Sequence, residues 1–523
     1  MEPVSEASSR GTSAARASRE IRARLGHPVI DADAHQLEFE PLLLEYLREV
    51  GGGQFAARAQ DALRAFFGWY QLSPAERRAS RAVRPPWGLP TGRADDVAAC
   101  MVPGLFRRAM DELGIDYAVI YPTLGIPYVR LAPPELRAAV CRAINRFYAD
   151  GFREHAARLT PAAMIPMTTP AQALAELEHA VGELGLKAIV IDCAVPRPIP
   201  ALAEVQQEIA QGKRPGVSPG LLRVMTWLDT FGVDSEYDYD PFWARCVELG
   251  VSPTAHMAGM WGTRTSVSSY VHNHIGMFAA SGEALCKSLF LAGVTYRFPE
   301  LQVALLEGGA SWACSLYADL IEHWEKRSLR AIDAYDPAQL DRDRLARALR
   351  EHGGERYARL LDQTLDQSLD QSLDRSCRGL FLLAGWVPEA GWEPRDPALL
   401  DEFARCPIED ERDLRDHFAG NFFFGCEASD PSVAWALDGR SLPLGARLQV
   451  LFGSDIGHWD VSDMRAVLAD AYRMVEAGRV TPEGFRAFSF ENAVRLHGRR
   501  RPDFFRGTSV EHEAAALLAA DGA

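Results

Sequence analysis

The chain has 523 residues, a formal net charge of -15 and a pI of about 5.4; 47% of its residues are hydrophobic and 24% are charged. This composition is typical of a globular protein with material for a large core, and its acidity argues against a nucleic-acid or anionic-membrane surface. No apolar run approaches the roughly 20 residues that span a bilayer. Nine scattered cysteines without a CxxC pair predict reduced thiols, so the cytoplasm is the expected compartment.

Residues 1–27 are rich in Ser, Ala, Arg and Glu and contain no apolar stretch, which predicts a disordered tail and argues against a secretory signal. An organellar transit peptide is the alternative, although three early glutamates are atypical of one. We expect one large domain over 28–500, followed by a loose C-terminal tail over 501–523.

The first predicted strand, 29–35, ends in Asp31-Ala-Asp33-Ala-His35. Alternation along a strand places these three polar side chains on one face. Carboxylates and an imidazole that converge at a strand end are typical ligands of a divalent metal. The alternative is a polar strand end that only caps a loop.

Strands and helices then alternate along the chain. Helices are predicted at 41–51, 54–69, 103–114, 134–154 and 169–184, and strands at 117–122, 159–167 and 187–192. Continuous apolar strands that alternate with helices indicate a parallel sheet covered by helices. Residues 196–240, rich in Pro, Gly and acidic residues, predict a long loop over one end of the sheet.

The second half continues the pattern. Strands are predicted at 251–256, 301–306, 421–426 and 448–453, and helices at 241–249, 285–294, 311–328, 462–476, 482–488 and 491–496. Eight strands, each followed by helix or by loop and helix, predict an α/β fold, a (β/α)8 TIM barrel with loop and helical insertions.

Residues 329–415 interrupt this order and are predicted to form a helical insertion. They contain a tetrapeptide repeat over 361–376 with a leucine every four residues, which makes one stripe on a helix. We favour a peripheral insertion helix; the alternative is a lid or the contact of a homodimer.

Polar residues fall at the ends of the predicted strands, namely Asp33, His35, His256, Glu307 and Asp455. The active site of this fold lies at the carboxyl ends of the strands, so five polar residues there favour a metal site. Three of them have a plainer alternative: a core histidine at 256, an exposed acid in a turn at 307, and a helix N-cap at 455.

Motifs along most of the chain resemble the amidohydrolase superfamily, in the branch of metal-dependent hydrolases and decarboxylases related to aminocarboxymuconate semialdehyde decarboxylase. The matching segments are Asp31-Ala-Asp-Ala-His35, Asp238-Tyr-Asp-Pro-Phe-Trp243, Glu248-Leu-Gly250, Thr254-Ala-His256, Phe298-Pro-Glu-Leu-Gln302, Glu307-Gly-Gly, Gly453-Ser-Asp455 and Glu491-Asn-Ala-Val-Arg-Leu-His497. Their order is specific, although no single segment is.

The resemblance implies that Asp33, His35, His256 and Asp455 bind the metal. The chain departs from the family after its sixth strand, where many relatives have His-x-Gly and this chain has Glu307-Gly-Gly. This departure puts the usual proton-transfer role of a decarboxylase in doubt.

A carboxylate at Glu307 can bridge two metals, whereas a neutral imidazole normally binds one. The five strand-end residues together exceed the roughly three protein ligands of a catalytic zinc. We therefore hypothesise one or two divalent ions per chain (Zn, Fe or Mn), with a two-metal site and a bridging hydroxide preferred. The rival interpretation has one metal, with Glu307 as a general base.

Further candidates lie near the predicted strand ends. His272 and His274, in the loop after the fifth strand, are predicted to contact substrate or to orient the ligands, and the alternative is that one or both bind metal. Trp261 and Trp459 are predicted to line an apolar pocket. His458 could orient substrate or transfer a proton, or could be an ordinary surface histidine.

The predicted function is metal-assisted hydrolysis of an amide, ester, lactone or thioester. The resemblance implies that Asp455 takes the proton of water, and His256 or His458 could stabilise the oxyanion. The alternative is non-oxidative decarboxylation of an aromatic or unsaturated acid. A third hypothesis is a barrel without catalytic activity that serves as a scaffold, and it predicts that metal-ligand positions are occupied by residues that cannot bind metal. The expected partner is a small hydrophobic carboxylic-acid derivative, with no nucleic acid and no membrane.

Overall fold

The computed structural model describes residues 4–86, 88, 93–131, 133–211, 213, 226–256, 259, 264–328, 331, 341–363 and 401–522. The chain divides into two compact units. The larger comprises Met1–Asp319 and Ile408–Ala523, and the smaller comprises Leu320–Pro407.

Eight parallel strands form the centre of the larger unit. They are β1 (Ile30–Gln36), β2 (Tyr117–Pro122), β3 (Leu159–Met164), β4 (Ala188–Ile191), β7 (Pro253–Ala255), β8 (Val303–Leu305), β9 (Phe422–Glu427) and β10 (Gln449–Gly453). They pair in exactly this chain order, and nearly all of their residues are buried, because helices cover the outside of the sheet. The predicted (β/α)8 barrel is therefore confirmed, including the position of each strand.

Backbone hydrogen bonds join β1 to the segment that follows β10, and we call this junction the seam. The Asp455 amide donates to the Asp33 carbonyl at 3.0 Å, and the His35 amide donates to the Ile456 carbonyl at 3.1 Å. The side chain of Asp31 adds to this seam, since its Oδ1 accepts from the amides of Ser454 at 3.0 Å and Asp33 at 3.2 Å. Asp31 thus holds β1 to the segment after β10.

We expect an Asp31→Ala variant to lose about 2–4 kcal/mol of unfolding free energy, because two buried amides would lose their acceptor. An Asp31→Asn variant keeps an acceptor oxygen and should lose clearly less. Denaturant unfolding of both variants measures the difference; equal stability of Asp31→Ala and the parent chain would contradict this role.

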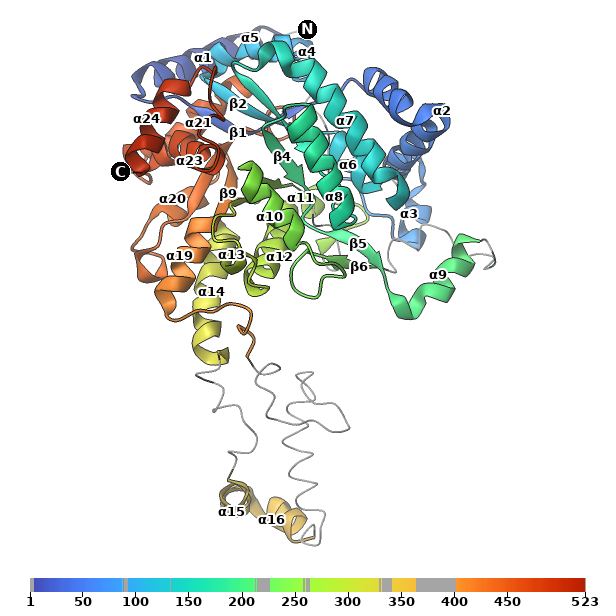
Figure 1. Cartoon of the computed structure of the whole chain (residues 1–523). Coiled ribbons are helices and arrows are strands. Elements are labelled where there is room, and N and C mark those ends of the chain that lie inside the picture. The colour runs from blue at the N-terminus through green and yellow to red at the C-terminus, as the bar shows by residue number, and fades with distance from the viewer. Residues whose placement is uncertain are drawn as a thin grey trace. The chain divides into compact units, whose positions relative to one another are not determined.

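Helices surround the barrel. Those between the strands are α2 (Glu40–Phe67), α3 (Pro74–Ser80), α4 (Ala94–Met101), α5 (Pro103–Leu113), α6 (Gly125–Leu131), α7 (Arg137–Phe152), α8 (Pro170–Leu177), α10 (Asp240–Leu249), α11 (Tyr270–His274), α12 (Met277–Leu291), α13 (Val294–Arg297), α14 (Ser311–Arg327), α19 (Glu411–Asn421) and α20 (Ser432–Leu437). Figure 1 shows α7, α8 and α10 side by side on one outer face. The two helices predicted at 41–51 and 54–69 form α2, which breaks at Gly52, where φ is 80°.

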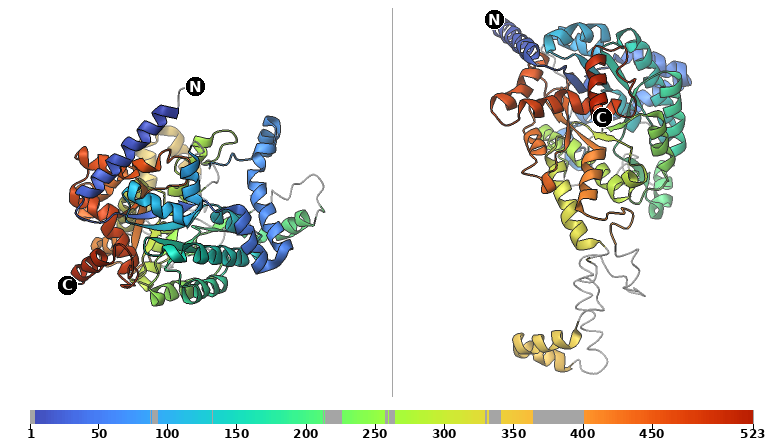
Figure 2. Two further views of the ribbon diagram at one scale, coloured as in Figure 1. Left: turned by 90° about the horizontal axis from the view of Figure 1, so that it is seen from above. Right: turned by 60° about the vertical axis from the view of Figure 1, so that its left-hand side comes forward.

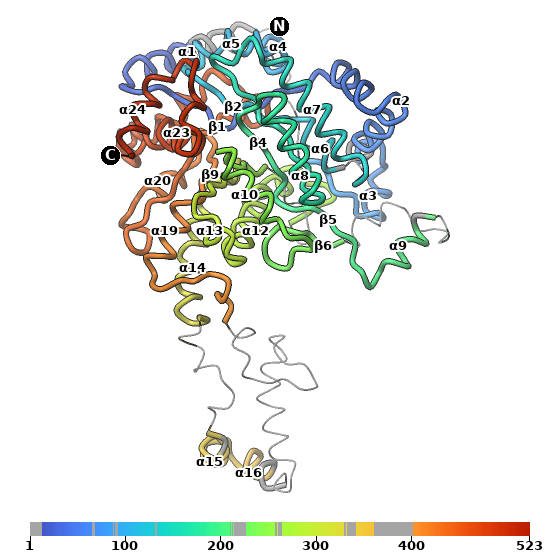
Figure 3. The backbone as a smooth tube through the Cα atoms, viewed as in Figure 1, coloured from blue at the N-terminus to red at the C-terminus, as the bar shows by residue number. Residues whose placement is uncertain are grey.

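The segment predicted as a long loop, 196–240, is partly ordered into secondary structure, so that prediction is wrong. β5 (Val195–Pro198) and β6 (Thr226–Asp229) form an antiparallel pair, and α9 (Ala203–Ala210) follows β5 (Figure 3). Arg197 stabilises the pair, because its Nε donates to Asp229 Oδ2 at 3.0 Å in a buried setting. Two prolines within β5 concealed this edge strand in the sequence.

The N-terminal tail, predicted to be disordered, and the C-terminal tail, predicted to be loose, both contain packed helices. α1 (Val4–Arg24) lies along α21 (Val467–Glu476), and in Figure 2 the blue N-terminal helix runs beside the red C-terminal helices. Ser18 Oγ donates to the Arg465 carbonyl at 2.6 Å. After α22 (Pro482–Arg486) and α23 (Asn492–Gly498), α24 (Glu511–Asp521) is held by an ion pair between Arg495 and Asp521 at 2.7 Å.

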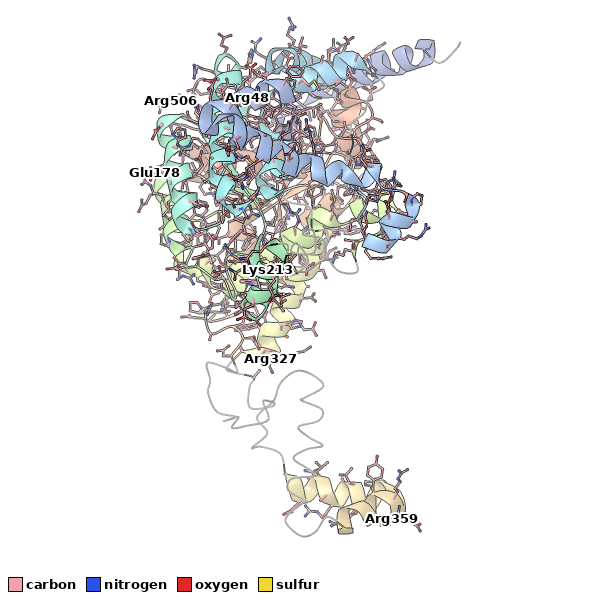
Figure 4. All side chains as sticks on the ribbon, turned by 90° about the vertical axis from the view of Figure 1, so that its right-hand side faces the viewer. Arg48, Glu178, Lys213, Arg327, Arg359 and Arg506 are labelled. Carbon is pink, nitrogen blue, oxygen red and sulfur yellow. The ribbon has the colours of Figure 1, made fainter. Side chains whose placement is uncertain are left out.

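Charged side chains cover the outside of the helices. Figure 4 labels Arg48 and Glu178, both exposed, and Glu178 pairs with Arg245 across neighbouring helices. Within the described part of the chain, none of the helices has the length and apolar character needed to cross a membrane.

The smaller unit contains α15 (Arg342–His352) and α16 (Gly354–Gln363), which pack against each other. Ala346 is buried there against Leu345 and Leu349, and Asp341 caps α15 by accepting from the Arg344 amide at 2.8 Å. The tetrapeptide repeat lies outside the described residues from 364 onward.

Candidate metal centre

Acidic and histidine side chains gather at the carboxyl ends of the barrel strands. Asp33 and His35 belong to β1, whereas His256, Glu307 and Asp455 directly follow or lie just beyond β7, β8 and β10. All five are buried, with at most 8% of each residue exposed. The structure therefore brings together every residue predicted as a metal ligand.

Distances within this cluster suit ligands of one ion. His35 Nε2 lies 3.4 Å from Asp33 Oδ1 and 3.5 Å from Asp455 Oδ1, and His256 Nε2 lies 4.0 Å from Asp33 Oδ1. Ligand atoms bound about 2.0–2.2 Å from one ion are separated by about 3–4 Å. Asp33, His35 and His256 thus have the spacing of a coordination shell, and Asp455 lies close to the same histidine, His35.

The same atoms need a cation to complete their interactions. Asp33 Oδ1, Asp455 Oδ1 and the Nε2 atoms of His35 and His256 are buried and have no hydrogen-bond partner among the described residues. Burial raises the pKa of Asp33 to about 6 and lowers the pKa of His35 to about 3 and of His256 to about 4. Neutral imidazoles and buried carboxylates are the forms that bind a divalent ion, so the donor set fits the predicted divalent-metal cofactor.

Two of the acidic residues adopt left-handed backbone conformations, with φ of 59° at Glu307 and 50° at Asp455. Such a conformation costs a residue with a Cβ about 1 kcal/mol or more. In both cases the turn that follows a strand directs the carboxylate into the cluster. Backbone strain therefore accompanies the side-chain geometry of this site.

Glu307 lies against His256, with Oε2 3.0 Å from Nε2. Burial raises the pKa of Glu307 well above its usual range, and the negative charges of Asp33, Glu427 and Asp460 raise it further. A concentration of carboxylates without water requires either protons or cations. Glu307 is thus a further potential ligand on the side of the cluster that faces His256.

His458 extends the cluster toward β2. Its Nδ1 is 2.5 Å from Asp455 Oδ1, its Nε2 is 3.3 Å from Thr123 Oγ1, and its ring centroid is 4.0 Å from that of His35. Burial lowers the pKa of His458 well below its ordinary value, and the neighbouring histidines lower it further. An imidazole with one nitrogen on a carboxylate is suited to proton transfer.

Aromatic rings border the cluster on the side of α11. The ring of Trp459 lies 5.0 Å from that of His274 and 5.1 Å from that of Tyr270, edge to face in both cases, and Phe278 lies 5.0 Å from the ring of His256. These half-buried rings offer an apolar wall beside the polar cluster.

The predicted substrate contacts divide into three cases. His274 and Trp459 border the cluster, whereas His272 is exposed on the same short helix and does not join it. Trp261 lies outside the described residues.

The sequence analysis missed two acidic residues beside the cluster, Asp460 and Glu427. Burial raises the pKa of Glu427 to about 7. Glu427 is the last residue of β9, so the strand-end rule that selected the other candidates could have found it. Asp460 follows β10 by seven positions and carried no such signal.

A family model described as "Amidohydrolase" matches residues 107–357. This range begins within α5 and ends within α16; β1 and β10, which carry three of the candidate ligands, lie outside it. The match confirms the resemblance seen in the sequence motifs.

Comparison with solved structures finds an amidohydrolase from Mycobacterium avium subsp. paratuberculosis K-10, at 16% identity over 91% of this chain and 100% of that chain, with a TM-score of 0.47. A 5-carboxyvanillate decarboxylase mutant from Novosphingobium aromaticivorans, with bound manganese, has 15% identity over 90% and 97% of the two chains and a TM-score of 0.47. A dihydroxybenzoic acid decarboxylase from Polaromonas sp. JS666, also with manganese, has 13% identity over 92% and 99% and a TM-score of 0.45. At these identities the reaction has to be inferred from the residues of the site itself.

Proposed function

We propose that this amidohydrolase-like barrel is a metal-dependent enzyme that acts at the carboxyl carbon of a small aromatic or unsaturated acid and removes that carboxyl group as CO2. The supporting observation is the group of buried ligand atoms on Asp33, His35 and His256, which all lie within 4.8 Å of one another. Asp455 joins them through its Oδ1, which lies 3.5 Å from His35 Nε2. The aromatic wall beside them, formed by Trp459, Tyr270 and Phe278, suits a flat, unsaturated substrate.

Bound by these four residues, a divalent metal would supply a Lewis acid for a carboxylate oxygen. The protein then has two tasks. The aromatic wall orients the ring and excludes water, and one acid delivers a proton to the carbon that loses CO2. We assign the proton transfer to His458, because its Nδ1 lies 2.5 Å from Asp455 Oδ1, where the carboxylate charge can stabilise the imidazolium, and its Nε2 lies on the opposite side of the ring, 3.3 Å from Thr123 Oγ1.

Hydrolysis of an ester, amide, lactone or thioester is the second candidate, and Asp455 favours it. Its Oδ2 is buried with no hydrogen-bond partner among the described residues. In a hydrolase this oxygen would take the proton of the attacking water.

The test is a turnover assay of the manganese-loaded protein in D2O with a panel of aromatic acids, including dihydroxybenzoates and 5-carboxyvanillate, because the similar solved structures include decarboxylases of these acids. Decarboxylation gives one CO2 per product and one deuterium at the carbon that carried the carboxyl group. A matched panel of aryl esters, amides and thioesters tests hydrolysis. Cleavage of the latter without any CO2 release from the acids would replace the first proposal by the second.

We expect a His458→Gln variant to retain its metal but to lose about 10²–10⁴-fold in kcat, since proton transfer by a positioned group contributes about this factor. Metal analysis and steady-state kinetics separate the two effects. His272→Gln, on the exposed side of α11, is the matched control and should match the parent chain. A kcat of His458→Gln within a few-fold of the parent would rule out this role.

A further inference from the structure

A second group of ligand side chains lies next to the first. His274, Glu307 and Asp460 each offer one ligand atom, and these atoms all lie within 4.8 Å of one another. The three residues come from α11, the turn after β8 and the loop after β10, so the tertiary fold, and not a local sequence motif, brings them together.

Several observations distinguish this group from an ordinary cluster of surface acids. Glu307 is buried. Neither Oε2 of Glu307 nor Oδ1 of Asp460 has a hydrogen-bond partner among the described residues. The third member is an imidazole, and His274 Nε2 lies 3.8 Å from Asp460 Oδ2. This mixed set of nitrogen and oxygen donors is one that zinc, manganese or iron accepts.

Glu307 connects the two groups. It contacts His256 of the first group at 3.0 Å and belongs to the second group through a carboxylate oxygen. A carboxylate has two oxygens and can bind two cations about 3.5–4 Å apart, as in two-metal sites. A histidine at this position would bind only one.

The charge of the combined cluster also favours two cations. Asp33, Glu307, Asp455 and Asp460 would carry four negative charges when ionised, and one divalent ion compensates for only two of them. Glu427 adds a fifth carboxylate nearby. Uncompensated buried carboxylates are strongly destabilising.

We propose that His274, Glu307 and Asp460 bind a second divalent cation beside the first, with Glu307 shared between the two ions. This inference rests on the proposed metal-dependent function and extends it, since it assigns Glu307 to metal binding and leaves proton transfer to His458. The second cation would provide another positively charged contact for an oxygen of an anionic substrate.

The test is a titration of chelator-treated full-length protein with Mn²⁺, in which calorimetry and electron paramagnetic resonance measure the binding. We expect two equivalents per chain, and magnetic coupling between neighbouring ions as the second equivalent binds. Asp460→Asn and His274→Gln should each bind one equivalent and show no coupling. His272→Gln, two residues from His274 and exposed, should bind two.

The outcomes separate this inference from the proposed function. One equivalent in the parent chain, abolished by Asp33→Asn, would overturn the second site and leave the metal-dependent function in place. Two equivalents that persist in both Asp460→Asn and His274→Gln would overturn the assignment of the ligands. No binding in the parent chain would overturn both proposals. Thermal melts of the metal-free variants identify any that fail to fold.

Discussion

A His35→Ala variant should lose its bound metal and at least about 10³-fold of its turnover, because His35 is the ligand that the other groups share. Its Nε2 lies between Asp33 and Asp455, at 3.4 and 3.5 Å, and it belongs both to the group with His256 and to the group with Glu307 and His458. Its imidazole is neutral at pH 7, since burial lowers its pKa to about 3, so no proton has to leave before it binds a metal.

Elemental analysis and thermal melting measure this loss. A ligand present at 1,000 times its Kd stabilises the folded state by about 4 kcal/mol. Added Mn²⁺ should therefore raise the melting temperature of the chelator-treated parent chain but not that of His35→Ala. His272→Ala removes an exposed histidine and should respond as the parent does. A metal-dependent stabilisation of His35→Ala equal to that of the parent would show that the ion binds elsewhere.

A Gly453→Ala variant should weaken metal binding about 10–100-fold although it alters no ligand. A Cβ at Gly453, the last residue of β10, would lie 2.9 Å from Cβ of Asp33 and 3.5 Å from the carbonyl oxygen of Cys426. Neither atom belongs to the end of a flexible side chain, so β1 would have to move and Asp33 with it. Overpacking of this kind typically costs about 1–3 kcal/mol of stability as well.

Gly420→Ala provides the control for the chemistry of the substitution. A Cβ at Gly420, near the end of α19, would meet no atom within 4 Å, so metal affinity should stay unchanged. Calorimetric Kd values for Mn²⁺ in the two variants give the comparison. Equal affinity in Gly453→Ala and Gly420→Ala would mean that the seam between β1 and β10 tolerates displacement without moving the ligands.

The barrel could be predicted from the sequence because most of its strands are short apolar runs between helical segments, and because β1 alternates small apolar residues with polar ones. The candidate ligands followed from the same pattern, since the strand ends of this fold converge whatever the details of the helices. Asp33, His35 and Asp455 needed only the positions of β1 and β10. The choice of reaction did not follow, because the same ligands serve both hydrolysis and decarboxylation.

The errors have physical causes that a single sequence conceals. α1 has an alanine- and arginine-rich sequence with little apolar patterning, and its order comes from packing on α21 and from the ion pair of Arg22 with Asp116. β5 contains two prolines and depends on the buried contact between Arg197 and Asp229. Asp460 joins the cluster only through the path of the loop after β10. In each case a tertiary contact outweighs local propensity.

The left-handed conformations of Glu307 and Asp455 matter to anyone who sets out to make this protein more heat-resistant. Glycine at a positive φ relieves about 1 kcal/mol, so a survey of backbone angles would select both positions for replacement, together with the exposed Arg81, whose φ is 52°. Only Arg81, which ends α3, can be exchanged without loss. At the other two positions glycine would relieve the backbone strain but remove a carboxylate of the cluster. This route to higher thermal stability is therefore closed at the two residues that the site needs.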